Sequence, residues 1–498
     1  MRKRLIVATV ILLLFSGGII GRLGYIALGT AYSVQEGFHS YSLLLDNVEP
    51  NIYDRNGIRM TNNVKEYCAI LRPDEAVLSE LSEVIPEANI ADTVMQMQNA
   101  KPFLYYSAEQ LTSTDNIPVF EVYTSHSSCE QLISRASSGL LSELDESIGS
   151  LKINYSVDAN GRILAGDRGT VTETHYRSME GLKLTLDSTV QDILYFACKD
   201  MKSGCALVMD TKTSSLLACV TKPDESYVNK IFSSYPVGSV FKTVVALCAL
   251  ENGLDPEYTC TDSITVGDTK YSCYQHKKHG KQHLKQALAN SCNCYFVSLA
   301  LTLGAERITD MAKRLGFNDV TTVYKDLKVR NASLPTDAEL RSKGELSLLG
   351  FGQGKLMATP LQFGSLMCTV ANEGIRQPVR IVKSEVAVNG METPVEYEEG
   401  KRVTDVESAT NLLAYLRYVV SDGSAGSADY KSLSAGKTAT AQTGSYRNGE
   451  ELLTTWFTGL YPYDEPQYAI VIVCEEGTGG AADCCPIFRT VVEMLDAL

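Results

Sequence analysis

The sequence predicts an α+β fold in which an antiparallel sheet is covered by helices, and three observations support this prediction. Two apolar runs joined by a short turn, residues 205–209 and 215–220, have the length and composition of buried strands. Three more strand-like runs lie near the C-terminus, at residues 437–443, 454–461 and 469–474. Apolar segments of helical length fill the interval between the two sets, so helices cover a sheet built from both ends of this segment.

The remaining elements follow from apolar periodicity and from turn residues. Residues 182–186 alternate as a strand does, and residues 191–201 have a helical pattern. The apolar run 244–250 follows Pro236 and Gly238, which break the chain, and it predicts a buried helix. Further helices are predicted at residues 307–315, 360–371 and 488–498.

The N-terminus predicts a membrane anchor. A basic cluster at residues 2–4 precedes the uncharged stretch 5–20, and apolar sequence resumes at residues 23–28. Because basic residues stay on the cytoplasmic side, we expect residues 1–28 to form a cytoplasmic tip and one transmembrane helix, with the rest of the chain exported. A cleaved signal peptide is the alternative, since small residues near position 30 permit cleavage.

The length and composition predict a chain of several domains. At 498 residues the chain is too long for one ordinary core. Residues 29–175 carry no motif with chemistry, and we expect a stalk and a non-catalytic pedestal domain of the dimerisation type there. A polar, turn-rich stretch around residues 158–181 marks the boundary to a larger domain at 176–498. The net charge of -14 argues against nucleic acid as a partner.

A serine and a lysine three residues apart, Ser239 and Lys242, form the first candidate catalytic motif. The predicted helix places Ser239 at its N-terminus and Lys242 one turn later on the same face. A serine hydroxyl becomes a good nucleophile when a base removes its proton, and a lysine of lowered pKa can be that base. Taken alone, Ser239 could equally be a helix cap.

Two further clusters strengthen the catalytic interpretation. Ser-Cys-Asn stands at residues 291–293, and Lys-Thr-Ala-Thr stands at residues 437–440. Alone, the first could be a turn and the second a solvated strand charge. Together with Ser239 and Lys242, they resemble the S-x-x-K, S-x-N and K-T-G set of serine enzymes that bind penicillin. Segments 184–187, 354–362, 371–374 and 456–459 also resemble landmarks of penicillin-binding transpeptidase domains.

The resemblance extends to the N-terminal part of the chain. Ile-Tyr-Asp-Arg-Asn-Gly at residues 52–57 resembles the entry to the non-catalytic domain of class B penicillin-binding proteins. The resemblance covers most of residues 180–498 and is thin over 60–165. It implies the transpeptidase fold, and it implies a D,D-transpeptidase that cross-links peptidoglycan stem peptides ending in D-Ala-D-Ala, that is inhibited by β-lactams and that needs no cofactor.

The resemblance also implies a role for each matched residue. Ser239 is the implied nucleophile, Lys242 the base, and Ser291 the relay that passes a proton to the departing D-alanine. The implied substrate-binding residues, which contact the amide and the carboxylate, are Asn293, Lys437, Thr438 and Thr440. Lys437 would also lower the pKa of Lys242 by like-charge repulsion. The backbone N–H groups of Ser239 and Thr440 would form the oxyanion hole.

One residue departs from the family pattern. The third motif reads Lys-Thr-Ala where the family usually has Lys-Thr-Gly, so Ala439 replaces a glycine. Because residues alternate along a strand, Ala439 shares a face with Lys437. Glycine at this position lets a substrate backbone lie close to the strand, so we expect the methyl group of Ala439 to narrow the groove slightly.

The cysteines and histidines give no metal-binding pattern in sequence. Cys260 and Cys273 could pair across a hairpin, while most of the 14 cysteines read as small buried residues. His276, His279 and His283 lie among lysines, which repel a cation. Cysteines at positions 292 and 294 have no partner pair at zinc spacing. We therefore expect no metal and no cofactor.

Two other functions share parts of this pattern. A β-lactamase would use the same acylation chemistry but needs a group that activates water for deacylation. A non-catalytic scaffold of a cell-wall growth complex is the alternative that Ala439 keeps open. The expected partners of the transpeptidase are stem peptides, β-lactams, the cytoplasmic membrane and a separate glycosyltransferase, because the residues before 181 leave room for only about one ordinary domain.

Overall fold

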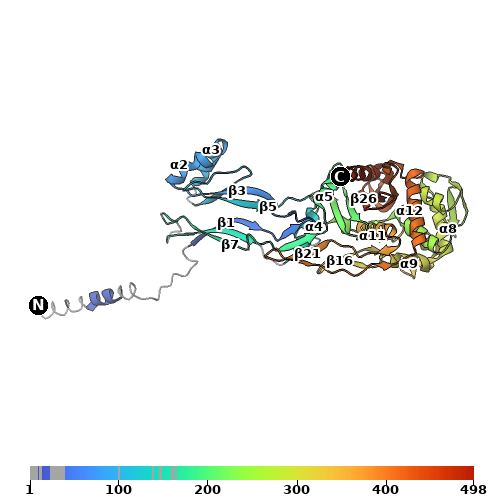
Figure 1. Ribbon diagram of the computed structural model, residues 1–498, viewed down its shortest axis with the longest axis horizontal. Coiled ribbons are helices and arrows are strands. Elements are labelled where there is room, and N and C mark those ends of the chain that lie inside the picture. The colour runs from blue at the N-terminus through green and yellow to red at the C-terminus, as the bar shows by residue number, and fades with distance from the viewer. Residues whose placement is uncertain are drawn as a thin grey trace. The chain divides into compact units, whose positions relative to one another are not determined.

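The computed structural model describes residues 9, 14–22, 40–98, 101–136, 139–144, 149–158, 163–164 and 166–498. The chain folds into two compact units (Figure 1). The predicted anchor and the first part of the predicted stalk, residues 29–39, lie largely outside the described residues. In the part of the chain that the structure describes, no helix combines the length and the apolar character needed to cross a membrane. The units are built from the following segments: Met1–Asn47, Lys65–Tyr123 and Gly149–Tyr176 in the first, and Val48–Val64, Thr124–Ile148 and Arg177–Leu498 in the second.

A five-stranded antiparallel sheet forms the centre of the second unit, which confirms the predicted fold class. Each of the five predicted strands belongs to it, and the order β10-β9-β26-β25-β24 joins the early pair to the C-terminal three. The strand β24 lies at one edge of this sheet, next to β25. The strands are β9 (Gly204–Asp210), β10 (Leu216–Lys222), β24 (Ala435–Arg447), β25 (Glu450–Tyr461) and β26 (Tyr468–Glu475).

Helices cover both faces of this sheet. Trp456 and Phe457 are consecutive on β25 and therefore point to opposite faces. Trp456 packs against Phe363 of α11 (Pro360–Ala371), and Phe457 packs against Phe488 of α14 (Cys485–Leu495). Trp456 and Phe457 are both fully buried, so the core extends over both faces of the sheet.

The helices of the second unit begin where the sequence offers a cap. Asp187 accepts backbone hydrogen bonds at the start of α5, and Thr359 does so at the start of α11. These caps explain why α5 begins three residues earlier than the predicted segment 191–201. The other helices of this unit are α4 (Glu130–Ile133), α5 (Ser188–Ala197), α6 (Lys242–Glu251), α7 (Leu284–Ala289), α8 (Asn293–Leu303), α9 (Ala305–Arg314), α10 (Lys343–Gly350), α12 (Val406–Ser421) and α13 (Gly480–Asp483).

Short strands complete the second unit. In one small sheet, β2 (Asn51–Tyr53) runs parallel to β8 (Gly181–Leu184), and β21 (Val382–Val386) and β22 (Glu392–Pro394) follow. The remaining strands lie in loops between helices: β11 (Tyr235–Pro236), β12 (Tyr258–Cys260), β13 (Ser263–Val266), β14 (Thr269–Ser272), β15 (Gly280–Gln282), β16 (Val320–Tyr324), β17 (Leu327–Arg330), β18 (Ala332–Ser333), β19 (Met357–Ala358), β20 (Ile375–Arg376) and β23 (Lys401–Arg402).

The first unit consists of two three-stranded sheets and a helical pair. One sheet has the order β1-β6-β7 and the other has the order β4-β3-β5. Residues 40–48, which fall within the predicted stalk, form β1. The elements are β1 (Ser40–Val48), β3 (Val64–Leu71), α2 (Glu75–Val84), α3 (Glu87–Met97), β4 (Phe103–Ser107), β5 (Val119–Thr124), β6 (Gly149–Ser156) and β7 (Thr170–Thr174).

A row of aromatic side chains connects the sheet to the segment that carries Ser239. The rings of Trp456, Phe363, Phe317 and Phe241 meet edge to face, with centroids 5.4, 5.5 and 5.7 Å apart in that order. The indole N–H of Trp456 donates to the carbonyl of Pro236 at 2.9 Å. Because these rings are fully buried, the turn around Ser239 is fixed against the sheet by the core itself.

Candidate active site

Ser239 lies in a tight turn directly before a buried helix. The turn is a 3₁₀ helix, η3 (Gly238–Phe241), and it continues into α6, so Ser239 stands at a helix start as predicted. Gly238 adopts a φ of 61°, and its N–H donates to the carbonyl of Gly352 at 2.8 Å. The neighbours Val240 and Phe241 are fully buried while Ser239 is only partly buried. The turn therefore presents the Ser239 hydroxyl at the surface of the core.

Lys242 places its amine beside the Ser239 hydroxyl. The distance from Lys242 Nζ to Ser239 Oγ is 3.0 Å. The same nitrogen lies 2.8 Å from the carbonyl of Ser291, 3.2 Å from Ser291 Oγ and 2.7 Å from Asn293 Oδ1. The side chain is fully buried, and burial lowers the pKa of Lys242 from 10.5 to about 8. A substantial fraction of Lys242 is therefore neutral at mildly alkaline pH, and a minor fraction is neutral at pH 7.

The hydrogen-bond partners of Lys242 suit a neutral amine. The Ser291 carbonyl and Asn293 Oδ1 can only accept, so they take the two N–H groups of the neutral form. The nitrogen lone pair is then left for a hydroxyl donor, and Ser239 Oγ lies at hydrogen-bond distance. This arrangement lets Lys242 remove the proton from Ser239, which is the requirement for a general base.

Ser291 bridges the two lysines. Its hydroxyl lies 3.2 Å from Lys242 Nζ and 3.2 Å from Lys437 Nζ. Lys437 is fully buried, and its pKa lies well below the usual value, first because of burial and second because of the charge of Lys242. The sequence led us to expect that Lys437 lowers the pKa of Lys242 by like-charge repulsion. In the structure the cause of the lowered pKa of Lys242 is burial and not Lys437.

Asn293 holds the base in place. Its Oδ1 accepts from Lys242, and its Nδ2 donates to the carbonyl of Ser272 at 2.9 Å. Asn293 begins α8 two residues after Ser291, whose φ of 52° lies in the left-handed region. In this structure Asn293 therefore contacts Lys242 and the β14 segment, a role that the sequence did not suggest.

Thr438 and Thr440 lie along the edge strand β24. The hydroxyl of Thr438 lies 3.4 Å from that of Ser424, and the hydroxyl of Thr440 accepts from the N–H of Gly480 at 3.4 Å. The sequence analysis missed Ser424 and Gly480. Neither residue belongs to a local motif, and only the packing of the loop after α12 and of α13 brings them to β24.

Ala439 faces the interior of the unit. Lys437, Ala439 and Ala441 share one face of β24, and all three are buried, Ala439 with 3% exposure. A Cβ atom built on Gly238 would lie 3.4 Å from the Ala439 methyl carbon, so the methyl group lies under the turn of Ser239. The predicted shared face with Lys437 is thus confirmed, but the methyl group fills core space beneath the serine.

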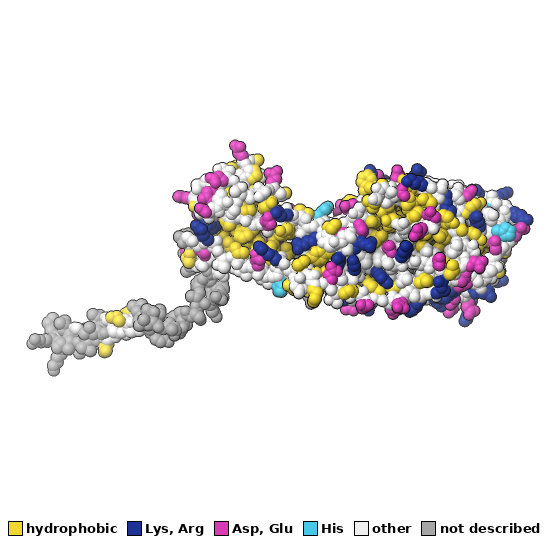
Figure 2. Space-filling view, viewed as in Figure 1, with side chains coloured by type: hydrophobic (Ala, Val, Ile, Leu, Met, Phe, Trp, Pro, Cys, Tyr) yellow, Lys and Arg dark blue, Asp and Glu magenta, His cyan; other side chains and the backbone are white. Residues whose placement is uncertain are grey.

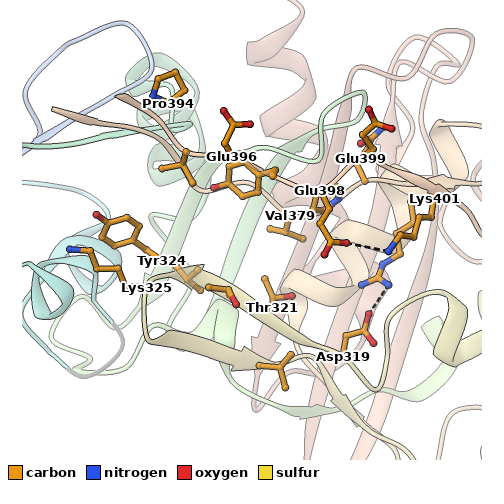
Figure 3. Close-up of a pocket in the computed structure, with 18 of the residues that line it drawn as sticks. Asp319, Thr321, Tyr324, Lys325, Val379, Pro394, Glu396, Glu398, Glu399 and Lys401 are labelled. Carbon is orange, nitrogen blue, oxygen red and sulfur yellow. Dashed lines mark hydrogen bonds and ion pairs between the residues drawn. The ribbon is translucent and has the colours of Figure 1, made fainter. Parts of the chain in front are cut away.

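A separate groove lies on another part of the second unit. Its volume is about 1060 Å³, and its lining comes from residues between 314 and 403, none of which belongs to the three motifs. Two ion pairs lie at this groove, Arg376 with Asp319 and Lys401 with Glu398, and dashed lines at Asp319 and at Lys401 mark them in Figure 3. On the face shown in Figure 2, basic and acidic side chains are likewise interspersed.

Comparisons with known proteins show the family to which the chain belongs. Residues 204–493 match the family model described as the penicillin binding protein transpeptidase domain. The chain is 27% identical to peptidoglycan D,D-transpeptidase MrdA of Haemophilus influenzae, over 63% of this chain and 56% of that protein. It is 30% identical to penicillin-binding protein PbpB of Mycolicibacterium smegmatis, over 70% of this chain and 61% of that protein.

Solved structures agree on the fold. Penicillin-binding protein 3 of Mycobacterium tuberculosis, complexed with aztreonam, superposes with a TM-score of 0.64 at 22% identity, over 91% of this chain and 97% of that one. The family match spans more than half of the chain. The chain therefore belongs to the penicillin-binding protein transpeptidase family, and within it to the class B penicillin-binding proteins. It spans between 56% and 61% of the length of the two curated relatives above.

Proposed function

We propose that this chain is a serine D,D-transpeptidase that cross-links peptidoglycan stem peptides and is acylated by β-lactams. The observation that carries the proposal is the fully buried Lys242 amine, 3.0 Å from the hydroxyl of Ser239. A structural role alone does not account for a buried lysine surrounded by two hydroxyls and two obligate acceptors. Such a lysine is costly to bury and useful as a base.

Acylation would begin at the Ser239 hydroxyl. Lys242 takes the proton while Ser239 Oγ forms a bond to the carbonyl carbon of the penultimate D-alanine. The carbonyl oxygen becomes negative, and the backbone N–H groups of Ser239 and Thr440 are the proposed donors to it. The C–N bond to the terminal D-alanine then breaks. Ser291 passes the proton from Lys242 to the leaving nitrogen, which its contacts to both lysines support.

The second half of the reaction repeats these steps in reverse. The amine of another stem peptide attacks the acyl-enzyme ester and loses a proton to Lys242 through the Ser291 hydroxyl. The ester bond to Ser239 Oγ then breaks, and Lys242 returns a proton to that oxygen. Thr438 and Thr440, on the edge strand, are the proposed contacts of the substrate carboxylate. Lys437, whose amine contacts the carbonyl of Thr438 at 2.9 Å, would supply positive charge there whenever it is protonated. Asn293 is the proposed contact of the substrate amide, which would take one of the hydrogen bonds that Asn293 now makes to Lys242 and Ser272.

The test is covalent labelling of the purified full chain with a fluorescent β-lactam, followed by mass mapping of the labelled peptide. We expect the label on Ser239 and none on the variant Ser239→Ala, with Ser234→Ala as a control because Ser234 is an exposed serine five positions earlier. Labelling that persists in Ser239→Ala would show that Ser239 is not the nucleophile.

Two further measurements separate the alternatives. A transpeptidase keeps the penicilloyl ester for a long time, whereas a β-lactamase hydrolyses it rapidly, so the deacylation rate distinguishes them. A non-catalytic scaffold would show no acylation at all. Normal growth of cells that carry Ser239→Ala, together with an unreactive parent protein, would favour the scaffold.

We also propose the setting of this enzyme. Residues 1–28 would anchor the chain in the cytoplasmic membrane with the catalytic domain outside, because a basic cluster precedes an uncharged apolar stretch. Most of residues 29–175 would form the stalk and pedestal, and residues 176–498 the transpeptidase domain, to which residues 48–64 and 124–148 also pack. A separate glycosyltransferase would supply the glycan strands. Protease added to intact protoplasts should digest the catalytic domain, and its protection would refute this orientation.

A further inference from the structure

Three cysteines and one histidine converge beside the catalytic motifs. The potential metal-binding atoms of Cys260, Cys273, His279 and Cys292 all lie within 4.8 Å of one another. Cys260 Sγ lies 3.7 Å from Cys273 Sγ and 3.5 Å from His279 Nδ1, and Cys273 Sγ lies 3.6 Å from Cys292 Sγ. These four residues, which we call the thiol cluster, come from four separate segments of the second unit.

Three of the six distances between the potential ligand atoms are close to the edges of a zinc tetrahedron, and the others lie within 4.8 Å. With zinc–sulfur bonds of about 2.3 Å and zinc–nitrogen bonds of about 2.0 Å, tetrahedral geometry requires about 3.8 Å between sulfurs and about 3.5 Å between sulfur and nitrogen. A disulfide between Cys260 and Cys273 would instead need about 2.05 Å between the sulfurs. It would also leave Cys292 and His279 without a role. All four residues have the donor atoms that zinc prefers.

The surroundings of the thiol cluster suit a structural metal. The three cysteines are buried, with exposures of 2, 3 and 0% for Cys260, Cys273 and Cys292, so four protein ligands would close the site to water. The backbone N–H of Tyr295 donates to Cys292 Sγ at 3.4 Å, the kind of outer contact that orients a metal thiolate.

The lysines near His279 in the sequence, whose charge would repel a metal ion, are exposed to solvent. Lys277, Lys278 and Lys281 are exposed, and Lys281 pairs with Glu257 at 2.7 Å. In the sequence, His279 and the three cysteines lie in separate segments. The antiparallel pairing of β12 with β15 joins them, because it places Cys260 opposite Gly280, the residue that follows His279.

We propose that Cys260, Cys273, His279 and Cys292 bind one Zn²⁺ ion that fixes the Ser291–Asn293 segment in its catalytic position. Three thiols release their protons to solvent on binding, the imidazole binds in its neutral form, and the zinc keeps its oxidation state. The resulting centre carries a net charge of -1.

The metal would act through the backbone around Cys292. Cys292 stands between Ser291 and Asn293, and it is the N-cap of α8. Ser291 has a φ of 52°, a conformation that a non-glycine residue keeps only when its surroundings enforce it. Zinc would hold Cys292 to the ends of β12 and β14, and Asn293 already donates to Ser272, the last residue of β14. The proposed zinc is thus a positioning group, and this part of the inference rests on the proposed function.

The first experiment tests metal binding without any assay of activity. The full chain is purified under reducing conditions without a chelator, and its zinc content is measured by mass spectrometry. We expect about one zinc per chain. After exchange for Co²⁺, we expect a thiolate-to-cobalt charge-transfer band and the intense visible bands of tetrahedral cobalt. After denaturation, all 14 cysteines should titrate as free thiols.

Variants test the ligand assignment. Cys273→Ser and His279→Gln should lose the zinc. Cys294→Ser is the matched control, since Cys294 Sγ lies 3.5 Å from Cys273 Sγ but does not belong to the thiol cluster. Cys248→Ser is a second control, as Cys248 is a buried free cysteine on α6. Circular dichroism of each variant separates loss of metal from loss of fold, and the cobalt spectrum of the parent tests the site even if Cys273→Ser does not fold.

The acylation rate tests the positioning role. Removal of zinc by a chelator should slow β-lactam acylation by about tenfold or more, and added Zn²⁺ should restore it. A purified chain that contains no zinc and takes up neither Zn²⁺ nor Co²⁺, or that has two fewer free thiols because of a disulfide, would overturn the site. Loss of zinc in Cys294→Ser with retention in Cys292→Ser would overturn the assignment of ligands. An unreactive parent that binds zinc would count against the proposed function and leave the metal site standing.

Discussion

At the scale of single residues, the environment of Lys242 decides whether the serine can react. The amine has exchanged water for two acceptor oxygens and two hydroxyls, and this burial lowers the pKa of Lys242 to about 8. The sequence predicted that Lys242 lies one helical turn from Ser239 because their spacing is local. It could not predict that burial is the main cause of the pKa shift, since burial depends on α8 and β24.

We expect acylation by a β-lactam to become faster as pH rises through about 8, because only neutral Lys242 can accept the proton of Ser239. The same lowered pKa should make the fold more stable as pH rises from about 8 towards 10.5, since the unfolded chain binds that proton more tightly.

Lys242→Arg should reduce the second-order acylation rate by about 10²–10⁴-fold, because a guanidinium stays protonated. Lys313→Arg, at an exposed position on α9, is the control. A flat pH profile would contradict the role of Lys242.

Ala439→Gly tests where the methyl group of the third motif lies. Because Ala439 has 3% exposure and faces the interior, we expect the acylation rate to change by less than about twofold, while the free energy of unfolding falls by about 0.5–1 kcal/mol. Ala441→Gly, on the same buried face of β24, should behave alike. A large gain in acylation rate for Ala439→Gly alone would show that the methyl group obstructs the substrate.

At the scale of elements, the turn of Ser239 depends on close contact between two backbones. The N–H of Gly238 donates to Gly352, and a Cβ atom on Gly352 would lie 1.9 Å from the carbonyl oxygen of Gly238. Gly354 has nearly the same φ, 81° against 83°, but a Cβ atom there would meet only the side chains of Leu348 and Glu345, at 3.3 Å or more. The two glycines therefore share backbone strain and differ in what they touch.

Gly352→Ala and Gly354→Ala form a matched pair. Both should lose about 1–2 kcal/mol of stability, because alanine resists a positive φ. Gly352→Ala should lose more than Gly354→Ala, because its Cβ atom would lie 1.9 Å from the carbonyl oxygen of Gly238. Only Gly352→Ala should also slow acylation, by at least about tenfold, because it displaces the turn that carries Ser239. A loss of about 1.4 kcal/mol of transition-state stabilisation corresponds to a factor of ten in rate. Acylation rates of the two folded variants check this. Equal rates would show that the Gly352 contact does not position the serine.

The elements that the sequence predicted best are those with a strong apolar pattern. The predicted helix 360–371 agrees with α11 at both ends, because Thr359 caps it and Pro360 begins it. The edge strand β24 continues to Arg447, beyond the predicted end at residue 443. Its last residues are exposed and pair only with β25, so they carry no apolar alternation that could have revealed them.

At the scale of the whole molecule, the second unit is built from three segments of the chain. Residues 48–64 belong to it, although the predicted domain boundary lies more than a hundred residues later. The fully buried Ile52 lies on β2, which pairs with β8, and Asp54 accepts from the hydroxyl of Ser188 at the start of α5. The N-terminal segment is thus part of the core of the second unit.

Ile52→Ala should lower the stability of the second unit by about 2–5 kcal/mol, because a buried side chain is lost from a packed core. The only tryptophan, Trp456, is fully buried in that unit, so its fluorescence during urea unfolding reports on this unit alone. Ile58→Ala is the control, since Ile58 is 55% exposed and should change stability by less than about 0.5 kcal/mol. Equal midpoints for the two variants would show that β2 contributes little to this core.

The sequence alone pointed to the candidate catalytic residues and predicted the strands of the central sheet. Ser239 and Lys242 are close because three residues make about one helical turn, and the strands follow from apolar runs of strand length. The tertiary structure alone decided which distant residues meet. Ser291 and Lys437 reach Lys242, and Cys260, Cys273, His279 and Cys292 reach one another, through packing of segments that are far apart in the chain. No local pattern encodes such contacts, because they arise only when helices and strands bury their apolar faces together.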